Sequence, residues 1–269
     1  MNKKEYSIVI LIITYNPDQR FLFSLETAKK VGNHVVIVDN NSNDKSFIKN
    51  IRENLDAKNI TILELQSNRG IAGALNCGVK YIKDNFNIEY ILTLDQDTII
   101  VSNNIGTIIT EANKRFDRVG IIALGTNDTK KLIDYKEVKK VITSGNLVKL
   151  EVFNSLRFRE EFFMDQVDFD FDFDVRNLGY KIIIANGDLI DHRLGNKIGN
   201  LFYEPLDRVY YIVRNSTILL FERKISYSEY IYQILFWSRS SIINDGFIRY
   251  IKTFIKGIND AFSRRLGKM

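Results

Sequence analysis

Two carboxylates one residue apart, placed directly after an apolar run, are the residues of this sequence best suited to chemistry. Segment 90–98 reads Y-I-L-T-L-D-Q-D-T, so Asp95 and Asp97 follow a stretch with the length and composition of a buried strand. The first and third side chains of an Asp-Gln-Asp triplet can point to one side and offer hard oxygen ligands to Mg²⁺ or Mn²⁺. Spacing alone leaves a surface turn open as an alternative, because short motifs also match by chance.

Segment 162–175 is a second acidic centre and reads F-F-M-D-Q-V-D-F-D-F-D-F-D-V. Its alternation of Asp and Phe is typical of a strand, whereas residues 177–179 resemble the C-terminal cap of a helix. Acids also favour the first turn of a helix. We predict a helix that starts near Asp168, with Asp165 and Asp170 as neighbouring acids.

The stretches that must position these acids alternate between short apolar strands and helices. We expect strands at 6–14, 34–38, 60–65 and 91–94, and helices at 21–30, 46–55 and 72–86. This alternation predicts a parallel sheet with crossover helices, whose ligands bind at the carboxyl ends of the strands. The phosphate loops G-x-G-x-x-G and G-x-x-x-x-G-K-S/T are missing, which argues against dinucleotide oxidoreductases and P-loop enzymes.

The second half of the chain is expected to continue as an α/β fold. We predict helices at 104–116 and 207–221, strands at 121–124 and 181–185, and two strand pieces within 141–148. Ser144 and Gly145 separate these two pieces. Small residues there indicate either the close approach of a ligand or a simple bulge, and both interpretations remain open.

Composition indicates a globular protein of ordinary makeup. Its 269 residues are 45% hydrophobic and 26% charged, and they suffice for one large or two small domains. The single cysteine, Cys77, excludes an internal disulfide and fits a reducing cytoplasm. No uncharged stretch is long enough to span a membrane, so we expect a cytoplasmic protein.

The positive charge of the chain is concentrated at its C-terminal end. Residues 222–269 contain nine basic and four acidic residues, which accounts for the whole formal charge of +5. We therefore predict a domain at 1–221 and a basic helical extension at 222–269, and we expect no nucleic-acid partner. Apolar residues at helical spacing between cations suit peripheral contact with an anionic membrane surface. The alternative is that these helices pack on the domain or form a homo-oligomer interface.

Eight short motifs occur in a fixed order along the chain. They are T-Y-N-P-D, V-V-I-V-D-N-N-S, N-R-G-I-A-G-A-L-N, L-T-L-D-Q-D-T, I-T-S-G-N-L, F-M-D-Q-V-D, H-R-L-G and Y-Y-I-V-R-N. Over about residues 6–220, this set resembles bacterial family 2 glycosyltransferases, in particular their rhamnosyltransferase-like branch. The resemblance implies the GT-A fold: an α/β domain with a Rossmann-like nucleotide-sugar-binding half, a mixed central sheet and flanking helices, here followed by C-terminal helices.

The resemblance also implies roles for residues on the donor side. Asp39 matches the acid that contacts the nucleoside base, with Tyr15 and Asn41 nearby. Asn68 and Gly70 match a loop beside the nucleotide. The remaining donor-side matches are the metal and diphosphate ligands Asp95 and Asp97, and a histidine, His192, that completes the metal site in related sugar transferases.

Further roles follow on the acceptor side. Asp168 matches the general base, and Ser144 and Gly145 match a stretch near the acceptor. Arg214 is interpreted either as a contact to the diphosphate or acceptor, or as part of a buried salt bridge. Asp172 and Asp174 depart from the family, in which an uncharged residue and an arginine are expected.

The combined prediction is an inverting, metal-dependent glycosyltransferase of surface-polysaccharide assembly. A divalent ion would neutralise the leaving diphosphate while a carboxylate deprotonates the attacking hydroxyl. The expected donor is dTDP-L-rhamnose, with UDP-galactofuranose or another UDP-sugar as the alternative, and the expected acceptor is a glycan or a polyprenyl-linked glycan. Two alternatives from other classes are a nucleotidyltransferase and an inactive sugar-nucleotide-binding subunit. The first would need a Gly-rich basic loop after the first strand, where T-Y-N-P-D has neither glycine nor Lys or Arg. The second is disfavoured by the intact acids Asp95, Asp97 and Asp168.

Overall fold

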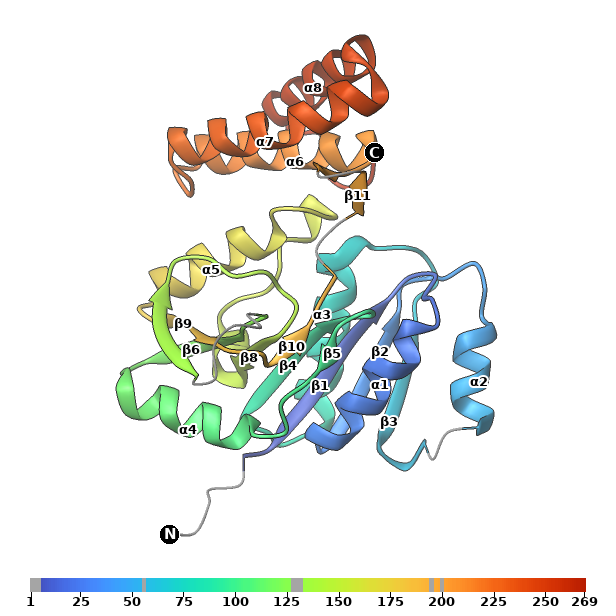
Figure 1. Cartoon of the computed structure of the whole chain (residues 1–269), viewed down its shortest axis with the longest axis vertical. Helices are drawn as coiled ribbons and strands as arrows, with labels where there is room; N and C mark the ends of the chain where they lie inside the picture. Colours follow the sequence, from blue (N-terminus) through green and yellow to red (C-terminus); the bar gives the residue numbers. More distant parts are fainter. Residues whose placement is uncertain (1–5, 55–56, 127–132, 194–195, 199–200) are drawn as a thin grey trace.

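The protein is built on one eight-stranded mixed sheet with helices on both faces and a helical layer above its upper edge (Figure 1). The computed structural model describes residues 6–54, 57–126, 133–193, 196–198 and 201–269. The helices are α1 (Arg20–Val31), α2 (Ser46–Asn54), α3 (Gly70–Asn85), α4 (Ile105–Arg115), α5 (Val167–Asn177), α6 (Leu206–Phe221), α7 (Tyr227–Asp245) and α8 (Phe247–Phe262).

The strand order of the main sheet is β3-β2-β1-β4-β8-β6-β9-β7. Its members are β1 (Ile8–Thr14), β2 (His34–Asp39), β3 (Ile60–Glu64), β4 (Tyr90–Asp95), β6 (Val119–Leu124), β7 (Asp134–Val138), β8 (Asn146–Lys149) and β9 (Lys181–Asn186). Two further pairs lie outside the main sheet: β5 (Ile99–Ile100) with β10 (Ile190–Asp191), and β11 (Asn196–Ile198) with β12 (Leu201–Tyr203).

The first half of the sheet is parallel, as the alternation of strands and helices predicted. Strands β1 to β4 all run in one direction, with helices α1, α2 and α3 in the connections between them. Side chains of a strand alternate between its two faces, and β1 is apolar at every position from Ile8 to Ile13. Alternate residues of β1 belong to two separate cores, so the strand is buried from both sides.

The second half of the sheet is mixed, and it contains the main departures from the predicted elements. Strand β8 runs antiparallel to both β4 and β6, and only 146–149 is a strand, so the prediction of two strand pieces in 141–148 was wrong for the first piece. Edge strand β7 was not predicted because its sequence D-Y-K-E-V is largely polar and solvent-exposed. The two-residue strands β5 and β10 are too short to produce a periodic pattern.

The helices divide between the two faces and the upper edge of the sheet. Helices α1 and α4 cover one face, where Phe21, Leu25 and Ile108 are buried, and α3 and α5 cover the other. Helices α6, α7 and α8 pack on one another as a separate layer (Figure 1). Among the described residues, no helix is long and apolar enough to cross a membrane.

Candidate active site

The carboxyl ends of three neighbouring strands bring the first set of predicted residues together. In the register of the sheet, Thr14 of β1 lies beside Asp39 of β2, and Ile13 lies beside Asp95 of β4. Strand β1 therefore separates the end of β2 from the end of β4. The predicted base-binding acid and the predicted metal ligand consequently occupy the same edge of the sheet, where open α/β sheets bind their ligands.

Asp95, Asp97 and His192 form a cluster with the donor atoms of a metal site. Their ligand atoms all lie within 4.8 Å of one another. The Nε2 atom of His192 lies 3.8 Å from an Asp95 carboxylate oxygen, and its Nδ1 atom lies 3.6 Å from one of Asp97. Two carboxylates and an imidazole are ligands that Mg²⁺ or Mn²⁺ accepts, so these residues fit a divalent ion.

A short pair of strands explains how His192 reaches acids that precede it by about 95 residues. Strand β5 begins two residues after Asp97, and β10 ends directly before His192. The antiparallel pairing of these strands places the histidine beside the Asp-Gln-Asp turn. Arg20 fixes the same two segments, because its guanidinium donates to the backbone carbonyls of Asp97, at 2.6 Å, and Asp191, at 3.1 Å.

Buried hydroxyl groups of Ser144 and Thr98 link the acids to the histidine. The Ser144 hydroxyl accepts the backbone N–H of Asp95 at 2.9 Å and lies 2.7 Å from the hydroxyl of Thr98. The Thr98 hydroxyl in turn lies 2.7 Å from Nδ1 of His192. Groups that hold the second nitrogen of a histidine orient its ring toward a metal. The predicted acceptor-side role of Ser144 stays a prediction, whereas its contacts are those of a positioning residue.

Gly145 adopts a backbone conformation that suits only glycine at this position. Its φ is +86°, and a Cβ atom there would lie 2.5 Å from Cδ1 of Ile190 in β10. Its N–H donates to the Thr93 carbonyl at 2.8 Å, and its carbonyl accepts the N–H of Leu124. Gly145 therefore allows β4, β6 and β10 to converge beneath the acids. Its acceptor-side role is not tested by these contacts.

The charges within the cluster act against one another. Desolvation raises the pKa of Asp95. The charges of His192 and Arg208 oppose this effect, and the charge of Asp97 adds to it. Desolvation also disfavours ionisation of Asp97, but the hydrogen bond and charge of His192 outweigh it and lower the Asp97 pKa. Desolvation lowers the pKa of His192, and the two carboxylates more than offset this, so its pKa is raised. A divalent cation would relieve the repulsion between the two acids.

Asp168 lies at the start of α5, as predicted, and its surroundings differ from those of the other acids. Desolvation by burial raises the pKa of Asp168 to about 7, against the hydrogen bond that its carboxylate accepts from the N–H of Phe169. The negative charges of Asp165 and Asp95 raise this pKa further, so Asp168 is close enough to the metal-ligand cluster to sense it. A carboxyl with a pKa near neutrality is suited to take up a proton.

The other acids of α5 and of the loop before it all have partners. Asp165 forms an ion pair with Arg208 at 2.7 Å, and Asp170 forms one with Lys224 at 2.8 Å. Asp174 also pairs with Lys224 at 2.8 Å, and the buried Asp172 accepts the backbone N–H of Val141 at 2.7 Å. Asp168 has no ion pair with any residue that the structure describes.

Arg214 and Asn215 in α6 hold the loop that leads into α5. This loop contains non-glycine residues with positive φ, namely Phe163, Asp165 and Gln166, a conformation that surrounding contacts must maintain. The side-chain amide of Asn215 donates to the carbonyls of Phe162, Met164 and Asp165 at 2.8–3.1 Å. The guanidinium of Arg214, only 1% exposed, donates to the carbonyls of Phe162, 52 residues before it, and Gly267, 53 residues after it.

The placement of Arg214 differs from one of the two interpretations of the sequence. Its guanidinium bonds backbone carbonyls, and it forms no ion pair with any described acid, so the expected buried salt bridge was wrong. A contact to the diphosphate or the acceptor stays a prediction, and burial beneath the loop makes Arg214 a positioning residue. The R-N pair of the motif Y-Y-I-V-R-N therefore serves to fix the position of Asp168.

The predicted donor-side residues surround the ends of β1 and β2. Asp39 is fully buried; it accepts hydrogen bonds from Ser42, and Lys45 covers it in an ion pair. Tyr15 lies at the rim, where its side chain is 44% exposed and its N–H donates to Gln96 at 2.8 Å. Asn41 has a positive φ of 65° in the turn after β2.

Asn68 and Gly70 begin α3, next to the loop that carries the candidate base. The side-chain oxygen of Asn68 accepts the N–H of Gly70 at 2.9 Å. Gly70 has a φ of +70°, and a Cβ atom there would lie 2.1 Å from the carbonyl oxygen of Phe163. The next residue, Ile71, donates its N–H to that same oxygen at 2.7 Å. Only glycine permits this approach between the two loops.

Two polar residues of this region were missed by sequence reasoning. Asn40 joins β2 to the start of α3, because its amide donates to Asn68 and Gly70 and its oxygen accepts the N–H of Arg69. Its place within V-V-I-V-D-N-N-S was a signal that went unused. Arg208 in α6 carries no motif, and only the fold shows that it pairs with Asp165 and Glu204 while its charge reaches Asp95.

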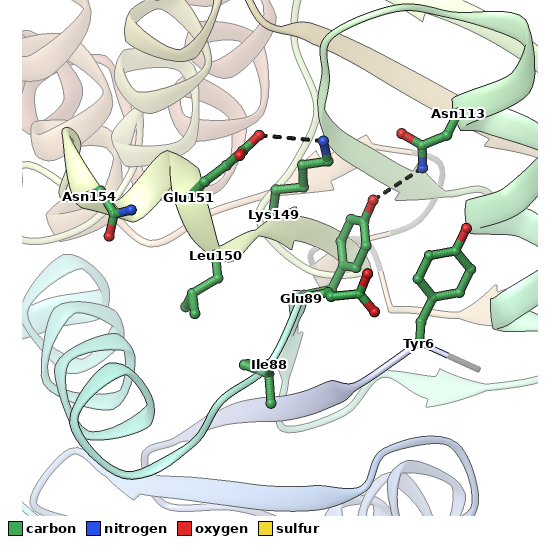
Figure 2. A pocket seen from close by; sticks show the side chains of 9 residues that line it. Tyr6, Ile88, Glu89, Asn113, Lys149, Leu150, Glu151 and Asn154 are labelled. Atoms are coloured by element: carbon green, nitrogen blue, oxygen red, sulfur yellow. Dashed lines mark hydrogen bonds and ion pairs between the residues drawn. The ribbon is translucent and has the colours of Figure 1, made fainter. Parts of the chain in front are cut away.

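A cavity lies at the end of β4 opposite to the acid cluster (Figure 2). It encloses about 480 Å³ and is lined by Tyr6, Tyr90, Asn113, Lys149 and Glu151, among others. The two ends of β4 are roughly 16 Å apart at about 3.3 Å per residue. In Figure 2 the Lys149 and Glu151 side chains face one another, 3.4 Å apart, and the amide of Asn113 donates to the Tyr90 hydroxyl. This cavity is therefore separate from the acid cluster.

Comparison with known proteins gives this arrangement a family. The model of glycosyl transferase family 2 matches residues 9–165, which is more than half of the chain, so the protein belongs to that family. The chain is 28% identical over 249 residues to the dTDP-rhamnosyl transferase RfbF of Shigella flexneri, covering 82% of this chain and 81% of the relative. The protein is therefore a glycosyltransferase.

Solved structures support the same fold. S. aureus TarS 1–349 in complex with UDP-GlcNAc aligns with a TM-score of 0.60 at 14% identity, covering 96% of this chain and 81% of the other. In a longer TarS structure the chain spans 49% of the length. The mannosyltransferase PcManGT from Pyrobaculum calidifontis, in complex with GDP-Man and Mn2+, aligns at 0.63 and 13% identity, over 97% and 76% of the two chains. The expected GT-A fold is confirmed.

Proposed function

We propose that the protein transfers L-rhamnose from dTDP-L-rhamnose to a hydroxyl group of a glycan or polyprenyl-linked glycan, with inversion at the anomeric carbon. The donor proposal is supported by the similarity to a dTDP-rhamnosyl transferase over most of both chains. The observation that carries the mechanism is the place of Asp168 in the first turn of α5, where it has no ion pair with any described residue and where burial raises its pKa to about 7.

The acid cluster would hold Mg²⁺ or Mn²⁺ through Asp95, Asp97 and His192. A bound ion would neutralise the charge that develops on the departing nucleoside diphosphate. The network from Ser144 through Thr98 to Nδ1 of His192 keeps the imidazole in place, and Arg20 fixes the backbone on both sides of the cluster. These contacts preorganise the ligands before the donor arrives.

Asp168 would act as the general base. The carboxylate takes the proton of the acceptor hydroxyl as that oxygen bonds to the anomeric carbon and the bond from this carbon to the diphosphate oxygen breaks. One displacement inverts the configuration. A retaining double displacement would need a dedicated nucleophile, whereas Asp165, Asp170 and Asp174 are committed to ion pairs.

The nucleotide would occupy the edge between the ends of β1 and β2 and the start of α3. Asp39, Tyr15 and Asn41 are proposed to contact the base, and Asn68 and Gly70 to border the nucleotide. Ser144 and Gly145 lie under the cluster, so they would influence the acceptor through the positions of Asp95 and His192. The alternative donor is UDP-galactofuranose or another UDP-sugar, because structural neighbours with UDP-GlcNAc and GDP-Man share the fold.

A donor-hydrolysis screen tests this function. The full chain is incubated with dTDP-L-rhamnose, UDP-galactofuranose, UDP-glucose and UDP-N-acetylglucosamine, each with Mg²⁺, Mn²⁺ or EDTA, and released nucleoside diphosphate is measured. We expect release from dTDP-L-rhamnose with a divalent ion and its loss in EDTA. Preferential release from a UDP-sugar would reassign the donor, and undiminished release in EDTA would contradict the metal site.

The proposed location is the cytoplasm, where nucleotide-sugars are made, with the protein held at the inner face of the cell membrane. Residues 1–221 are proposed as the catalytic domain and residues 222–269 as its helical extension. Helix α6, within the first range, packs against α8 through Val213 and Gly257, so the two parts share an extensive interface.

A further inference from the structure

The outer helices α7 and α8 expose an unusual share of the large apolar side chains. Of the 16 exposed large hydrophobic residues of the described chain, ten lie between Phe221 and Phe262. Single exposed hydrophobics are normal, but a concentration of them marks a surface that another surface covers. The concentration is greatest on α8 and on the middle of α7.

The apolar stripe of α8 is distinct from the face that packs on the protein. At about 100° per residue, Phe247, Ile248, Ile255 and Phe262 fall within one arc of about 100°. Each of the four is at least 51% exposed. The buried residues of α8, which are Tyr250, Gly257, Asp260 and Ala261, project from a different side of the helix. Packing on α6 therefore does not explain why this stripe is apolar.

Helix α7 carries a similar stripe with a cation in its middle. Tyr232, Leu235, Phe236 and Ile243 are 41–68% exposed and recur at helical spacing. Arg239 lies between them on the same arc. Neither stripe contains an acidic residue, so both combine apolar side chains with positive charge.

The cations beside the two stripes are uncompensated. Arg239, Arg249 and Lys252 have no acidic partner among the residues that the structure describes. The nearby acids are engaged in the interior: Asp260 accepts the Tyr210 hydroxyl at 2.8 Å, and Asp245 accepts that of Tyr203 at 3.2 Å. This surface therefore selects for an anionic partner.

We propose that the exposed stripes of α7 and α8 rest on an anionic lipid surface, with both helices parallel to the membrane. Exposed apolar side chains would enter the boundary between headgroups and acyl chains while Arg239, Arg249 and Lys252 contact anionic headgroups. A second copy of the chain fits less well, because a two-fold contact through these stripes would bring like charges together.

This inference adds a partner to the proposed transferase, and only its link to a polyprenyl-linked acceptor rests on the proposed function. The helical layer lies above the edge of the sheet that carries the acid cluster (Figure 1). A lipid-linked acceptor held in the membrane would therefore be presented from the side of the molecule on which the candidate base lies.

Vesicle co-sedimentation of the full chain tests the proposal. The probes are vesicles of phosphatidylcholine alone and vesicles with about 30% phosphatidylglycerol. We expect strong pelleting only with the anionic vesicles, weakened by raised salt. The double variant Ile248→Asp, Ile255→Asp should lose at least tenfold in apparent affinity. Charge reversal by Arg249→Glu and Lys252→Glu should remove the preference for anionic vesicles.

The matched control is Phe23→Asp, because Phe23 in α1 is 66% exposed and lies outside the helical layer. This variant should bind vesicles like the unaltered chain. Vesicle binding that survives the Ile248 and Ile255 substitutions, or no binding by the unaltered chain, would overturn the proposal. A dimer in analytical ultracentrifugation that the same substitutions dissociate would do so as well. Donor hydrolysis without vesicles is measured in parallel, so failure of lipid binding is distinguished from failure of the transferase.

Discussion

Two acidic regions of this protein differ in how the negative charges of their side chains are balanced. At the end of β4, Asp95 and Asp97 share one imidazole, and neither acid forms an ion pair with a lysine or arginine that the structure describes. Along α5 and the loop before it, Asp165, Asp170 and Asp174 each pair with a lysine or arginine, Asp172 accepts a backbone N–H, and Asp168 has no ion pair among the described residues. The comparison shows that residue type alone does not assign a role. A deficit of positive charge indicates a cation site. Among the described residues, Asp168 has neither an ion pair nor a hydrogen bond from another element, and such an acid indicates a base.

The largest effect is expected from Asp168→Asn. Loss of the proposed base should lower kcat by about 10²–10⁴-fold, the typical contribution of general base catalysis. Donor affinity should change little, because Asp168 is not one of the proposed metal ligands. Transfer rates and donor binding are measured separately, by product formation and by calorimetry.

Asp174→Asn is the matched control for this substitution. Asp174 lies on the same helix, is partly exposed and pairs with Lys224. Its loss should leave kcat within about twofold, since an exposed ion pair contributes little. An equal loss of kcat in Asp168→Asn and Asp174→Asn would show that the ion pair of Asp174 does not distinguish it from Asp168.

Asp97→Ala tests the deficit of positive charge at the end of β4. Removing one of three ligands should abolish metal-dependent stabilisation by the nucleotide, while metal-independent nucleotide binding persists. Thermal-shift measurements with dTDP, with and without Mn²⁺, report both quantities. A variant that keeps the full Mn²⁺-dependent shift would show that Asp97 does not bind the ion.

Ser144→Ala tests whether the hydroxyl network orients the metal ligands. We expect the apparent affinity for Mn²⁺ to fall by about 10–100-fold, as for other groups that support metal ligands. Ser102→Ala is the control, since the Ser102 hydroxyl bonds only its own turn, at the N–H of Asn104. The apparent affinity for Mn²⁺ is measured by titrating the ion in the donor-hydrolysis assay. An unchanged Mn²⁺ affinity in Ser144→Ala would show that other contacts orient His192.

The smallest effect concerns the pH dependence of Asp168. Its folded-state pKa of about 7 lies above the ordinary value of 3.8, so the folded protein binds this proton more tightly than the unfolded chain. Stability from this group is full below about pH 4 and is lost as the pH rises to about 7. Asp168→Asn should therefore raise Tm at pH 8 and leave it unchanged at pH 4. Each 1 kcal/mol gained in the free energy of unfolding corresponds to roughly 2–4 °C in Tm.

The same pKa predicts the pH dependence of the reaction. The base must be ionised, so kcat/KM should fall as the pH drops below about 7. A bound donor and metal ion would compensate the negative charge of Asp95, which raises the pKa of Asp168. The pH below which kcat/KM falls would then move to a lower value. A rate that is constant between pH 5 and 8 would contradict protonation of this acid.

Much of the donor half could be predicted from the sequence, because its signals are local. Apolar strands that end in Asp39 and Asp95 fix both the parallel sheet and the edge at which these acids lie. The helix near Asp168 was predicted correctly for the same reason, because its signal is local. The helix cap at 177–179 indicated a helix, although the alternation of Asp and Phe is typical of a strand. Such inferences require only strand period and helix capping.

The rest depends on contacts that no local pattern records. The β5–β10 pair has two residues in each strand, yet it brings His192 to the acids, and the resemblance to a family rather than periodicity indicated that histidine. Arg214 illustrates the opposite case, since its type suggested a buried salt bridge whereas its guanidinium donates to backbone carbonyls that are distant in sequence. Arg208 was overlooked because its partners are distant in sequence.

Helix α6 has two sides with different tasks, and this limits how the protein can be shortened. One side carries Asn215, which grips the loop before α5, and the other carries Val213, which lies against Gly257 of α8. Removing α7 and α8 would expose the side of α6 that they cover. Because α6 also holds the loop before the proposed base Asp168, the position of this carboxylate would be affected. Loss of activity in a protein truncated after α6 would therefore reflect a displaced active-site loop. It would not show that the enzyme needs to be bound to a membrane.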